Sequence, residues 1–530
     1  MGRVRSYRQR IAFEMRSVWM KSVVSLMERA LREEFARSPV EAEVLARASA
    51  SWLPGLGLDV LPGQVRLGVP VTRSRRHAVS MRGLALVTAV DALEDTWAWG
   101  AWGLAGMQRS RVVRWLFEVR CSGGWASLAE VAAWANVTPK GLANRLQPLR
   151  ERGVWLPHVG GAAEQVESLG VSAWLLDRFL AVGSVDDDLE LVGVTPSVWA
   201  RVLAGAVLVR DAGGAAVEAL AARLGWSALK VAQVRLVLKR HARAARRLMA
   251  PASALPTADG WAPTVDTSSM RDALLSRYGF TSLAADLYLE WLAQLVARLK
   301  AAPVGEGELV VFAIDASEGA RARLSEAKLV PVRLSFFTPH DAALGPKSTL
   351  RTRVAEMKFA RIERFASQAR AQGALLTLPD LAVLLGMHVD AVRHHIAEHP
   401  DVVVPTRGRV RDIGRGVTHK TWIVELYLQM HSETEIVERT QHSYESVEAY
   451  LREFVRVMTL ADRGMNAVMI RRVTQRSLSL VKAYLELYQR YDRPEHHFRL
   501  SQLRHAFTLD DVLNGKKGGR TRFRTEDPRA

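Results

Sequence analysis

The stretch Leu128–Leu146 reads LAEVAAWANVTPKGLANRL, the pattern of two short helices joined by a tight turn. Four further stretches align with it without a gap, and each has an apolar residue at the fourth and the fifteenth place. Such a helix-turn-helix unit packs its two helices across each other and leaves the second free to enter a DNA major groove. The repeated unit therefore predicts a mainly helical protein. The four further copies are Val217–Arg235, Leu378–Ile396, Glu433–Leu451 and Ala467–Leu485.

The copies differ in how well they suit this geometry. The ninth place lies in the turn and needs a residue that tolerates positive φ, so glycine suits it, asparagine is acceptable and glutamine is poor. The fifth place, where the helices cross, needs a small residue, but Arg471 occupies it in the last copy, and Lys230 fills another normally small place in the copy at 217. We expect the copies at 128 and 378 to be well formed and the copy at 467 to be the weakest. The ninth places hold Asn136, Gly225, Gly386, Gln441 and Gln475.

The outward residues of the second helices predict which copies contact DNA. Hydroxyl, amide, guanidinium, ammonium and imidazole groups can reach phosphates and base edges. The copy at 433 instead presents Glu445 and Glu448, so we expect it to bind a protein partner or to pack internally. The alternative for any copy is a structural hairpin or a dimerisation surface. The predicted DNA-binding residues of the helix-turn-helix units are Thr138, Lys140, Asn144, Arg145, Lys239, Arg240, Arg243, Arg393, His394 and His395.

A wing is expected after the copy at 378. The stretch Asp401–Ile413, DVVVPTRGRVRDI, reads as a strand, a turn at Arg407 and Gly408, and a second strand. Arg407 and Arg409 would then reach the DNA backbone or the minor groove beside the recognition helix. A satellite hairpin with solvated arginines is the alternative.

Charge and composition favour a polyanionic partner. The chain of 530 residues has a net charge of +18, which together with the repeated units points to double-stranded DNA. The single cysteine, Cys121, excludes an intrachain disulfide and a thiolate zinc cluster. The longest suspicious apolar stretch, 96–108, is too short to span a bilayer. We expect a cytoplasmic, nucleoid-associated bacterial protein without membrane contact, and a homodimer is compatible with the sequence.

Several domains are expected. The proline-containing stretch 251–266 predicts a linker, and aromatic usage changes there, since 13 of 15 tryptophans precede residue 266 and 8 of 9 tyrosines follow it. Beyond it, helices are expected over 268–301, with an apolar face of Leu274, Tyr278, Leu283, Leu287, Leu292 and Val296. With strands near 308–314 and 329–337 they predict a small α+β insertion, which could sense a ligand or mediate dimerisation. The predicted order is a helical region 1–110, a helix-turn-helix with an optional wing 111–160, a helical domain 161–250, the linker 251–266, the α+β domain 267–350, a winged helix-turn-helix 351–416, a tandem helix-turn-helix 417–492 and a basic tail 493–530.

The second half of the chain also carries a set of short matches to one family. They include Leu329–Val332, Gly373–Leu376, Val404–Gly408 and Val424–Leu428, together with His442–Ser443 and Tyr450–Leu451. On these residues the segment from about 272 to 491 resembles a bacterial family, domain of unknown function 1670. The resemblance implies helix-turn-helix content and no established activity or site residues.

No catalytic signature stands out. His496 and Arg499 have the spacing of a tyrosine recombinase motif, but Tyr488 and Tyr491 precede it instead of following far downstream. Asp315 lacks further strand-borne carboxylates for a two-metal centre, and no phosphate-binding glycine loop occurs. We therefore expect no enzyme activity, metal or cofactor. The sequence predicts a sequence-specific DNA-binding protein, with a transcriptional regulator as the first hypothesis. An accessory or assembly protein of a plasmid, phage or transposable element is the second, and a recombinase is a minor third.

Overall fold

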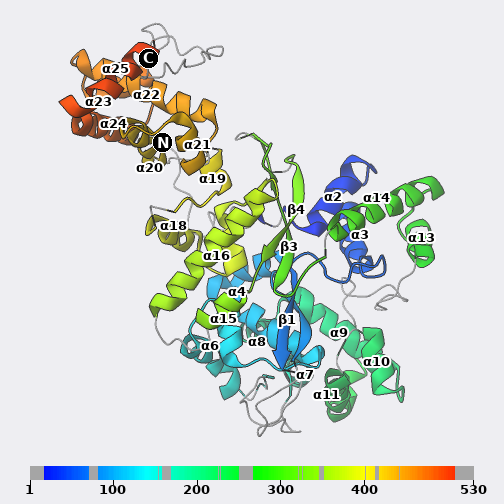
Figure 1. The fold of residues 1–530 in the computed structure, drawn as a ribbon. Coiled ribbons are helices and arrows are strands. Elements are labelled where there is room, and N and C mark those ends of the chain that lie inside the picture. The colour runs from blue at the N-terminus through cyan, green and yellow to red at the C-terminus, as the bar shows by residue number, and fades with distance from the viewer. Residues whose placement is uncertain are drawn as a thin grey trace. The chain divides into compact units, whose positions relative to one another are not determined.

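The computed structural model describes residues in two compact units, residues 1–399 and 400–530. The described residues are 17–18, 20–70, 82–152, 154, 156–157, 169–224, 226, 228–249, 267–301, 303–319, 322–324, 326–344, 351–399, 402–411, 417–440 and 442–507. We call the two parts unit 1 and unit 2 and describe each by itself. Both are mainly helical (Figure 1).

The sheet of unit 1 draws its strands from both ends of that unit. Strands β3 (Glu308–Asp315) and β4 (Leu329–Ser335) pair antiparallel and confirm the two predicted strands. Two strands that the sequence did not reveal, β1 (Gln64–Pro70) and β2 (Arg82–Thr88), pair with each other, and β1 then pairs antiparallel with β3. The order is β2-β1-β3-β4, with the short β5 (Ala374–Leu375) beside β3. Strands from both sides of the predicted linker 251–266, itself outside the described residues, thus share one sheet.

Helices cover the sheet of unit 1 (Figure 1). The helices α2 (Val23–Glu33), α3 (Pro39–Trp52), α13 (Thr267–Ser276) and α14 (Ser282–Lys300) form one apolar core with the face of β3 that carries Val310, Phe312 and Ile314. The long helices α4 (Ala92–Cys121) and α16 (Arg351–Ala371) pack against β2 and β4, respectively, and the short α15 (Pro339–Leu344) precedes α16.

The predicted helices over 268–301 are confirmed, but their predicted apolar face is only partly right. Leu292 and Val296 are buried as expected, whereas Leu283 and Leu287 are exposed. The buried stripe of α14 follows the three-and-four spacing through Ala285, Tyr288, Leu292, Leu295 and Leu299, and the two exposed leucines lie outside that stripe.

The remaining helices of unit 1 are short. Those in the middle of the chain are α7 (Val171–Val182), α8 (Asp186–Val192), α9 (Pro196–Asp211), α10 (Val217–Leu224), α11 (Ala228–Arg240) and α12 (Ala242–Ala245). Two helix pairs, α5 (Leu128–Trp134) with α6 (Pro139–Glu151) and α17 (Leu378–Leu385) with α18 (Val389–Ala397), are treated below. No single helix among the described residues has the length and apolar character of a membrane span, although the bent pair α8–α9 passes that test as a pair.

Unit 2 is built from α19 (Arg407–Val410), α20 (Val417–Leu428), α21 (Glu433–Thr440), α22 (Tyr444–Asp462), α23 (Ala467–Thr474), α24 (Leu478–Tyr491), the 3₁₀ turn η2 (Pro494–His496) and α25 (His497–Ala506). One apolar cluster runs through them and includes Ile436, Phe454, Tyr484 and Leu503. Residues 494–506 of the segment predicted as a basic tail are therefore folded onto unit 2. Residues 508–530, with the basic run GKKGGRTRFR, lie outside the described residues.

The predicted wing is wrong. Arg407 to Val410 form the single helical turn α19 in place of a strand-turn-strand hairpin. The Thr406 carbonyl accepts the amides of Arg409 and Val410 at 3.0 and 2.9 Å, so these amides bond locally and are not offered to a neighbouring strand. A wing after the copy at 128 would fall mostly on residues outside those described.

Candidate nucleic-acid interface

The copies at 128 and 378 both form helix-turn-helix units. Ser127 and Glu130 make a reciprocal capping box at the start of α5, and Thr377 and Asp380 do the same for α17. The ninth place is left-handed in both, with φ 55° at Asn136 and φ 62° at Gly386. The apolar residues of the fourth and fifteenth places are fully or almost fully buried. These features confirm the predicted local structure of the two copies.

The other three copies also have two helices each. They are α10–α11, α21–α22 and α23–α24, while the turn residues Gly225 and Gln441 lie outside the described residues. The copy at 467, predicted to be the weakest, is as regular as the others. Gln475 adopts φ 58° although it has a side chain, and Arg471 is exposed, so it does not enter the helix crossing.

On α6 the predicted DNA-binding residues have different surroundings. Lys140 and Asn144 are exposed. Thr138 is the N-cap of the helix, and its hydroxyl oxygen accepts the Gly141 amide at 3.1 Å. Arg145 is half-buried, and its Nη1 is buried without a hydrogen-bond partner among the described residues. Lys140 and Asn144 are therefore the two exposed members of this predicted set on α6.

On α18 the predicted residues are less cationic than the sequence suggested. Arg393 pairs with Asp390 at 2.6 Å, and the exposed His394 lies 3.1 Å from Glu398. The side chain of His395 is only 13% exposed, and burial together with the positive charge of Lys358 lowers its pKa. Arg393 and His394 face solvent and His395 does not.

The remaining predicted contacts lie elsewhere. Lys239, Arg240 and Arg243 are exposed at the end of α11 and on α12, and Arg240 makes an ion pair with Asp177 at 3.0 Å. Arg407 and Arg409 lie on α19 of unit 2, where the Arg409 guanidinium is 5.5 Å from the centre of the Trp422 ring. Because these two arginines lie on a helical turn, they do not lie on the hairpin that was predicted to place them in the minor groove.

A buried polar network joins the copies at 128 and 378 and was missed at the sequence level. Asn136 Nδ2 donates to the Leu385 carbonyl at 3.0 Å, and Arg361 Nη1 donates to Asn136 Oδ1 at 2.7 Å. Arg111 Nη1 donates to the Val383 carbonyl at 2.6 Å. The sequence contains one signal for this network, because Arg111 and Arg361 each precede the first residue of their copy by 17 positions.

A second cluster near these helices is cationic. The side chain of Lys358 is close enough to both Arg145 on α6 and His395 on α18 for their charges to interact. Burial and the charge of Arg145 lower the pKa of Lys358, and burial and the charge of Arg109 lower that of Arg145. Arg145 Nη1 is buried without a hydrogen-bond partner among the described residues. An anion would relieve this mutual repulsion.

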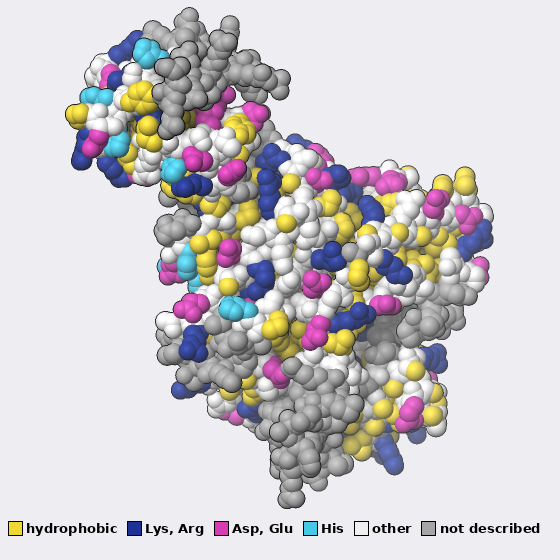
Figure 2. Space-filling model, viewed as in Figure 1, with side chains coloured by type: hydrophobic (Ala, Val, Ile, Leu, Met, Phe, Trp, Pro, Cys, Tyr) yellow, Lys and Arg dark blue, Asp and Glu magenta, His cyan; other side chains and the backbone are white. Residues whose placement is uncertain are grey.

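Surface charge alone does not outline an interface. On the face drawn in Figure 2, lysine and arginine side chains alternate with carboxylates and apolar atoms and do not form one continuous basic area. The helix-turn-helix surfaces therefore have to be argued from their own residues.

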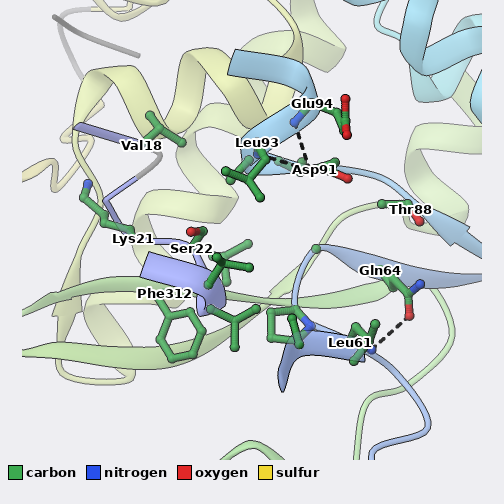
Figure 3. Close-up of a pocket in the computed structure, with 18 of the residues that line it drawn as sticks. Val18, Lys21, Ser22, Leu61, Gln64, Thr88, Asp91, Leu93, Glu94 and Phe312 are labelled. Atoms are coloured by element: carbon green, nitrogen blue, oxygen red, sulfur yellow. Dashed lines mark hydrogen bonds between the residues drawn. The ribbon is translucent and has the colours of Figure 1, made fainter. Parts of the chain in front are cut away.

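One large cavity of unit 1 does not resemble a ligand site. It has a volume of about 600 Å³ and lies between the start of α4, the strands and the segment that leads into α2 (Figure 3). Its polar side chains are already engaged. Lys21 binds Asp380 at 2.7 Å, Gln64 accepts the Leu61 amide, and Asp91 caps α4 through the amide of Glu94. The ligand-sensing alternative for the α+β segment therefore gains no support here.

The recombinase-like residues are held in structural contacts. The Tyr488 hydroxyl donates to Asp462 at 2.7 Å and that of Tyr491 to Glu425 at 3.1 Å. Burial and the Asp462 carboxylate raise the pKa of Tyr488 to about 12, the opposite of what a nucleophilic tyrosine needs. Arg499 lies 4.6 Å from the centre of the Tyr427 ring. Among the described residues no group of His, Cys, Asp and Glu has the arrangement of a metal site.

Comparison with known proteins gives one result, in the second half of the chain. Residues 286–487 match a family described as "Protein of unknown function (DUF1670)". The match confirms the resemblance that the quoted residues of this segment predicted. The match begins within α14 and ends within α24, so it covers part of unit 1 and most of unit 2. No curated protein and no solved structure matches the chain.

Proposed function

We propose that this protein binds double-stranded DNA in a sequence-specific way and without catalysis, as a transcriptional regulator of the bacterial cytoplasm and nucleoid. The observation that carries the proposal is the pair of regular helix-turn-helix units in unit 1 whose second helices expose polar residues. These are Lys140 and Asn144 on α6 and Arg393 and His394 on α18. An amide reads adenine and a guanidinium reads guanine in the major groove.

Two further features support this proposal. The net charge of +18 favours association with a polyanion at moderate salt. Several units in one chain also raise each other's effective concentration at a composite site, so modest individual affinities suffice. The exposed Lys239, Arg240 and Arg243 would supply contacts to the phosphate backbone. The proposal uses helix-turn-helix units alone and no wing.

The test is salt-titrated binding of the full-length protein to fragmented genomic DNA, followed by sequencing of the bound fragments. We expect a shared motif that survives near-physiological salt. The double variant Arg393→Ala, His394→Ala should relax part of that motif. The matched control is Arg271→Ala, which removes a partly exposed arginine that is also paired with a carboxylate, Asp286, but lies on α13 and outside the helix-turn-helix copies. Binding that fades with salt and yields no motif would overturn the proposal.

A second candidate function is that of an accessory or assembly protein of a plasmid, phage or transposable element. The acidic surface of α21 and α22, with exposed Glu435 and Glu445, favours it because carboxylates repel DNA and suit a protein partner. Regularly spaced binding sites beside genes of such an element would support it, and scattered promoter sites would not. The recombinase alternative predicts strand cleavage of the bound fragment and is tested in the same reactions.

A further inference from the structure

Unit 1 contains one module twice. Residues 23–151 form α2, α3, β1, β2, α4, α5 and α6, and residues 267–397 form α13, α14, β3, β4, α15 with α16, α17 and α18. The order is the same in both: a helix pair, a hairpin of two strands, a long helix and a helix-turn-helix. The first module gave no family match, whereas the family segment includes most of the second.

The equivalence extends to single residues. The hairpins have the same register, because Gln64 pairs with Thr88 at one end of the first and Glu308 with Ser335 at the same end of the second. Special backbone conformations also recur at equivalent places of the two modules. The pairs with positive φ are Ala36 and Gly279, Gly63 and Gly307, Gly123 and Gly373, and Asn136 and Gly386.

The long helices bind the ends of their own hairpins in the same manner. Arg114 Nε donates to the Thr88 carbonyl at 3.2 Å, and Arg364 Nε donates to the Ser335 carbonyl at 3.0 Å. A side chain one turn further on repeats the contact, since Glu118 accepts from Thr88 and Gln368 accepts from Ser335. Two unrelated segments would not share the same register, backbone conformations and hydrogen bonds, so the two modules are diverged copies of one module.

The two copies contact each other reciprocally. In a two-fold interface, residue i of one copy contacts residue j of the other, and residue j contacts residue i. The Gly63 amide donates to the Val310 carbonyl at 2.8 Å, and the equivalent Gly307 amide donates to the Arg66 carbonyl at 2.8 Å. Likewise Arg111 donates to the Val383 carbonyl, and its equivalent Arg361 reaches the Ala133 carbonyl at 3.4 Å.

Two contacts join a residue to its own equivalent and therefore lie at the pseudo-two-fold axis. Val65 pairs with Leu309 where β1 meets β3. The Arg37 guanidinium lies 3.9 Å from the centre of the Phe280 ring, where the two helix pairs meet. Strands, helix pairs and helix-turn-helix units are thus all related by one pseudo-two-fold operation.

This symmetry relates the two second helices. A DNA duplex has two-fold axes perpendicular to its length, so a two-fold pair of helix-turn-helix units matches an inverted repeat. Two exposed positions coincide, Lys140 with Asp390 and Asn144 with His394, but the residues differ. The exposed Arg393 corresponds to the half-buried Ala143. Resting on the function proposed above, we propose that unit 1 reads two unlike half-sites in inverted orientation, as a dimer fused into one chain, with α6 on one half and α18 on the other.

The cationic cluster fits the centre of such a site. Arg145 and His395 occupy equivalent places on α6 and α18, and Lys358 interacts with both. Lys358 lies on α16, which packs against α18, and its charge also acts on Arg145 of α6, so a phosphate bound near these helices would meet it. His395 already has the Glu398 carboxylate at 3.4 Å, whereas Arg145 Nη1 is buried without a hydrogen-bond partner among the described residues, so a phosphate there would pair with Arg145.

The experiment is selection of bound sequences from a duplex library with a random central region, using the full-length chain. We expect two half-sites in inverted orientation with different sequences. Lys140→Ala with Asn144→Ala should erase base preference in one half only, and Arg393→Ala with His394→Ala in the other half only. Each pair should weaken binding to the full site about tenfold. All four side chains are exposed, and a thermal melt verifies that each variant folds.

A second measurement re-orients one selected half-site to give a direct repeat. Affinity for this duplex should fall to that of a single half-site. Equal affinity for direct and inverted repeats, a motif in one undivided block, or loss of the same bases by both variant pairs would overturn the inference and leave sequence-specific binding intact. Selection of no motif would overturn the proposed function, and with it the inference.

Discussion

The helix-turn-helix units of this protein are assembled in two opposite ways. In unit 1 the partners α5–α6 and α17–α18 are 250 residues apart, and the long helix that precedes each one donates a hydrogen bond to a carbonyl of the other. In unit 2 the copies α21–α22 and α23–α24 are 34 residues apart and follow head to tail, with α22 packed against both α23 and α24. In a reciprocal pair the two copies cover equivalent surfaces of each other, whereas a head-to-tail pair leaves one such surface uncovered. The exposed Val468, Met469 and Val473 on α23 fit that contrast.

The local chemistry of the copies does not explain the difference. Within unit 2, Thr440 and Thr474 each donate their hydroxyl to a carbonyl four residues earlier, so the two copies are built alike. What differs is the segment that precedes each copy. A long helix with a buried arginine precedes each unit of the reciprocal pair, whereas α20 and α22 precede the two units of the serial pair. Substitution of one of these buried arginines therefore tests whether it stabilises the reciprocal pair.

Arg361→Met should produce the largest effect. The side chain is fully buried and donates to Asn136 and to the Phe336 carbonyl, so its loss leaves buried acceptors without partners. We expect unit 1 to lose about 3 kcal/mol of stability. Hydrogen exchange followed by mass spectrometry reports each unit separately and should show loss of protection in unit 1 alone. Arg271→Met, an exposed paired arginine, serves as the control and should change little. Equal loss in unit 2 would contradict the assignment.

Lys230→Met probes the copy of unit 1 that stands outside the reciprocal pair. Where the paired copies have Gly141 and Ala391, this copy has a lysine whose ammonium lies 4.0 Å from the centre of the Trp226 ring, beside a cavity of about 260 Å³. Burial lowers the pKa of Lys230 to about 8. Between that pKa and the unfolded value near 10.4, only the unfolded chain carries the proton, so stability rises with pH across this window.

The variant lacks this titration. At pH 7 its free energy of unfolding should exceed that of the parent by up to about 3 kcal/mol, and this difference should decrease as pH rises from 8 to 10. Urea unfolding at a series of pH values measures the difference, and Lys140→Met, at an exposed position, is the matched control. A difference in stability that stays constant with pH would show that packing and not charge is responsible.

Glycine introduced at the ninth place should stabilise unit 2 and destabilise unit 1. Gln475→Gly relieves a left-handed residue in unit 2 and should stabilise it by about 0.5 kcal/mol. Asn136→Gly also relieves such a residue but removes the side chain that bonds Leu385 and Arg361, so unit 1 should lose about 2 kcal/mol. Denaturant unfolding of both variants checks the signs. Stabilisation by both would mean that the network across the pseudo-two-fold axis contributes nothing.

Lys358→Gln should give the smallest change and concerns DNA binding alone. If Lys358 meets a phosphate between the half-sites, its loss weakens binding to all sequences alike and lowers the slope of log affinity against log salt by about 1. Arg145→Gln should act in the same way, and Lys358→Arg should restore the slope. Affinity measured at four salt concentrations on the selected site and on a scrambled duplex decides this. A change in base preference would place these residues in direct readout instead.

The sequence by itself determined the local structure. Apolar residues at the fourth and fifteenth places, caps such as Ser127 with Glu130, and Gly386 in the turn specify two crossed helices through contacts within 19 residues. The strands β3 and β4 were equally visible, because short runs rich in apolar and β-branched residues between polar ones can be recognised without knowledge of the partner strand. The family segment followed from residues of the same stretch.

Only the tertiary structure decided how these pieces combine. Strand β1 joins β3 across more than 240 residues, and no local pattern encodes which edge a strand will meet. Arg111 and Arg361 read as surface arginines until their carbonyl acceptors appear in the other module, and His395 reads as exposed until Lys358 and α16 pack beside it. The arginine-rich stretch after α18 forms a helical turn and no wing because its amides bond to the preceding Thr406 and Arg407 carbonyls. Burial and reciprocal pairing depend on residues far apart in the chain. For this reason only the tertiary structure shows that two of the similar copies form a two-fold pair and two others a serial pair.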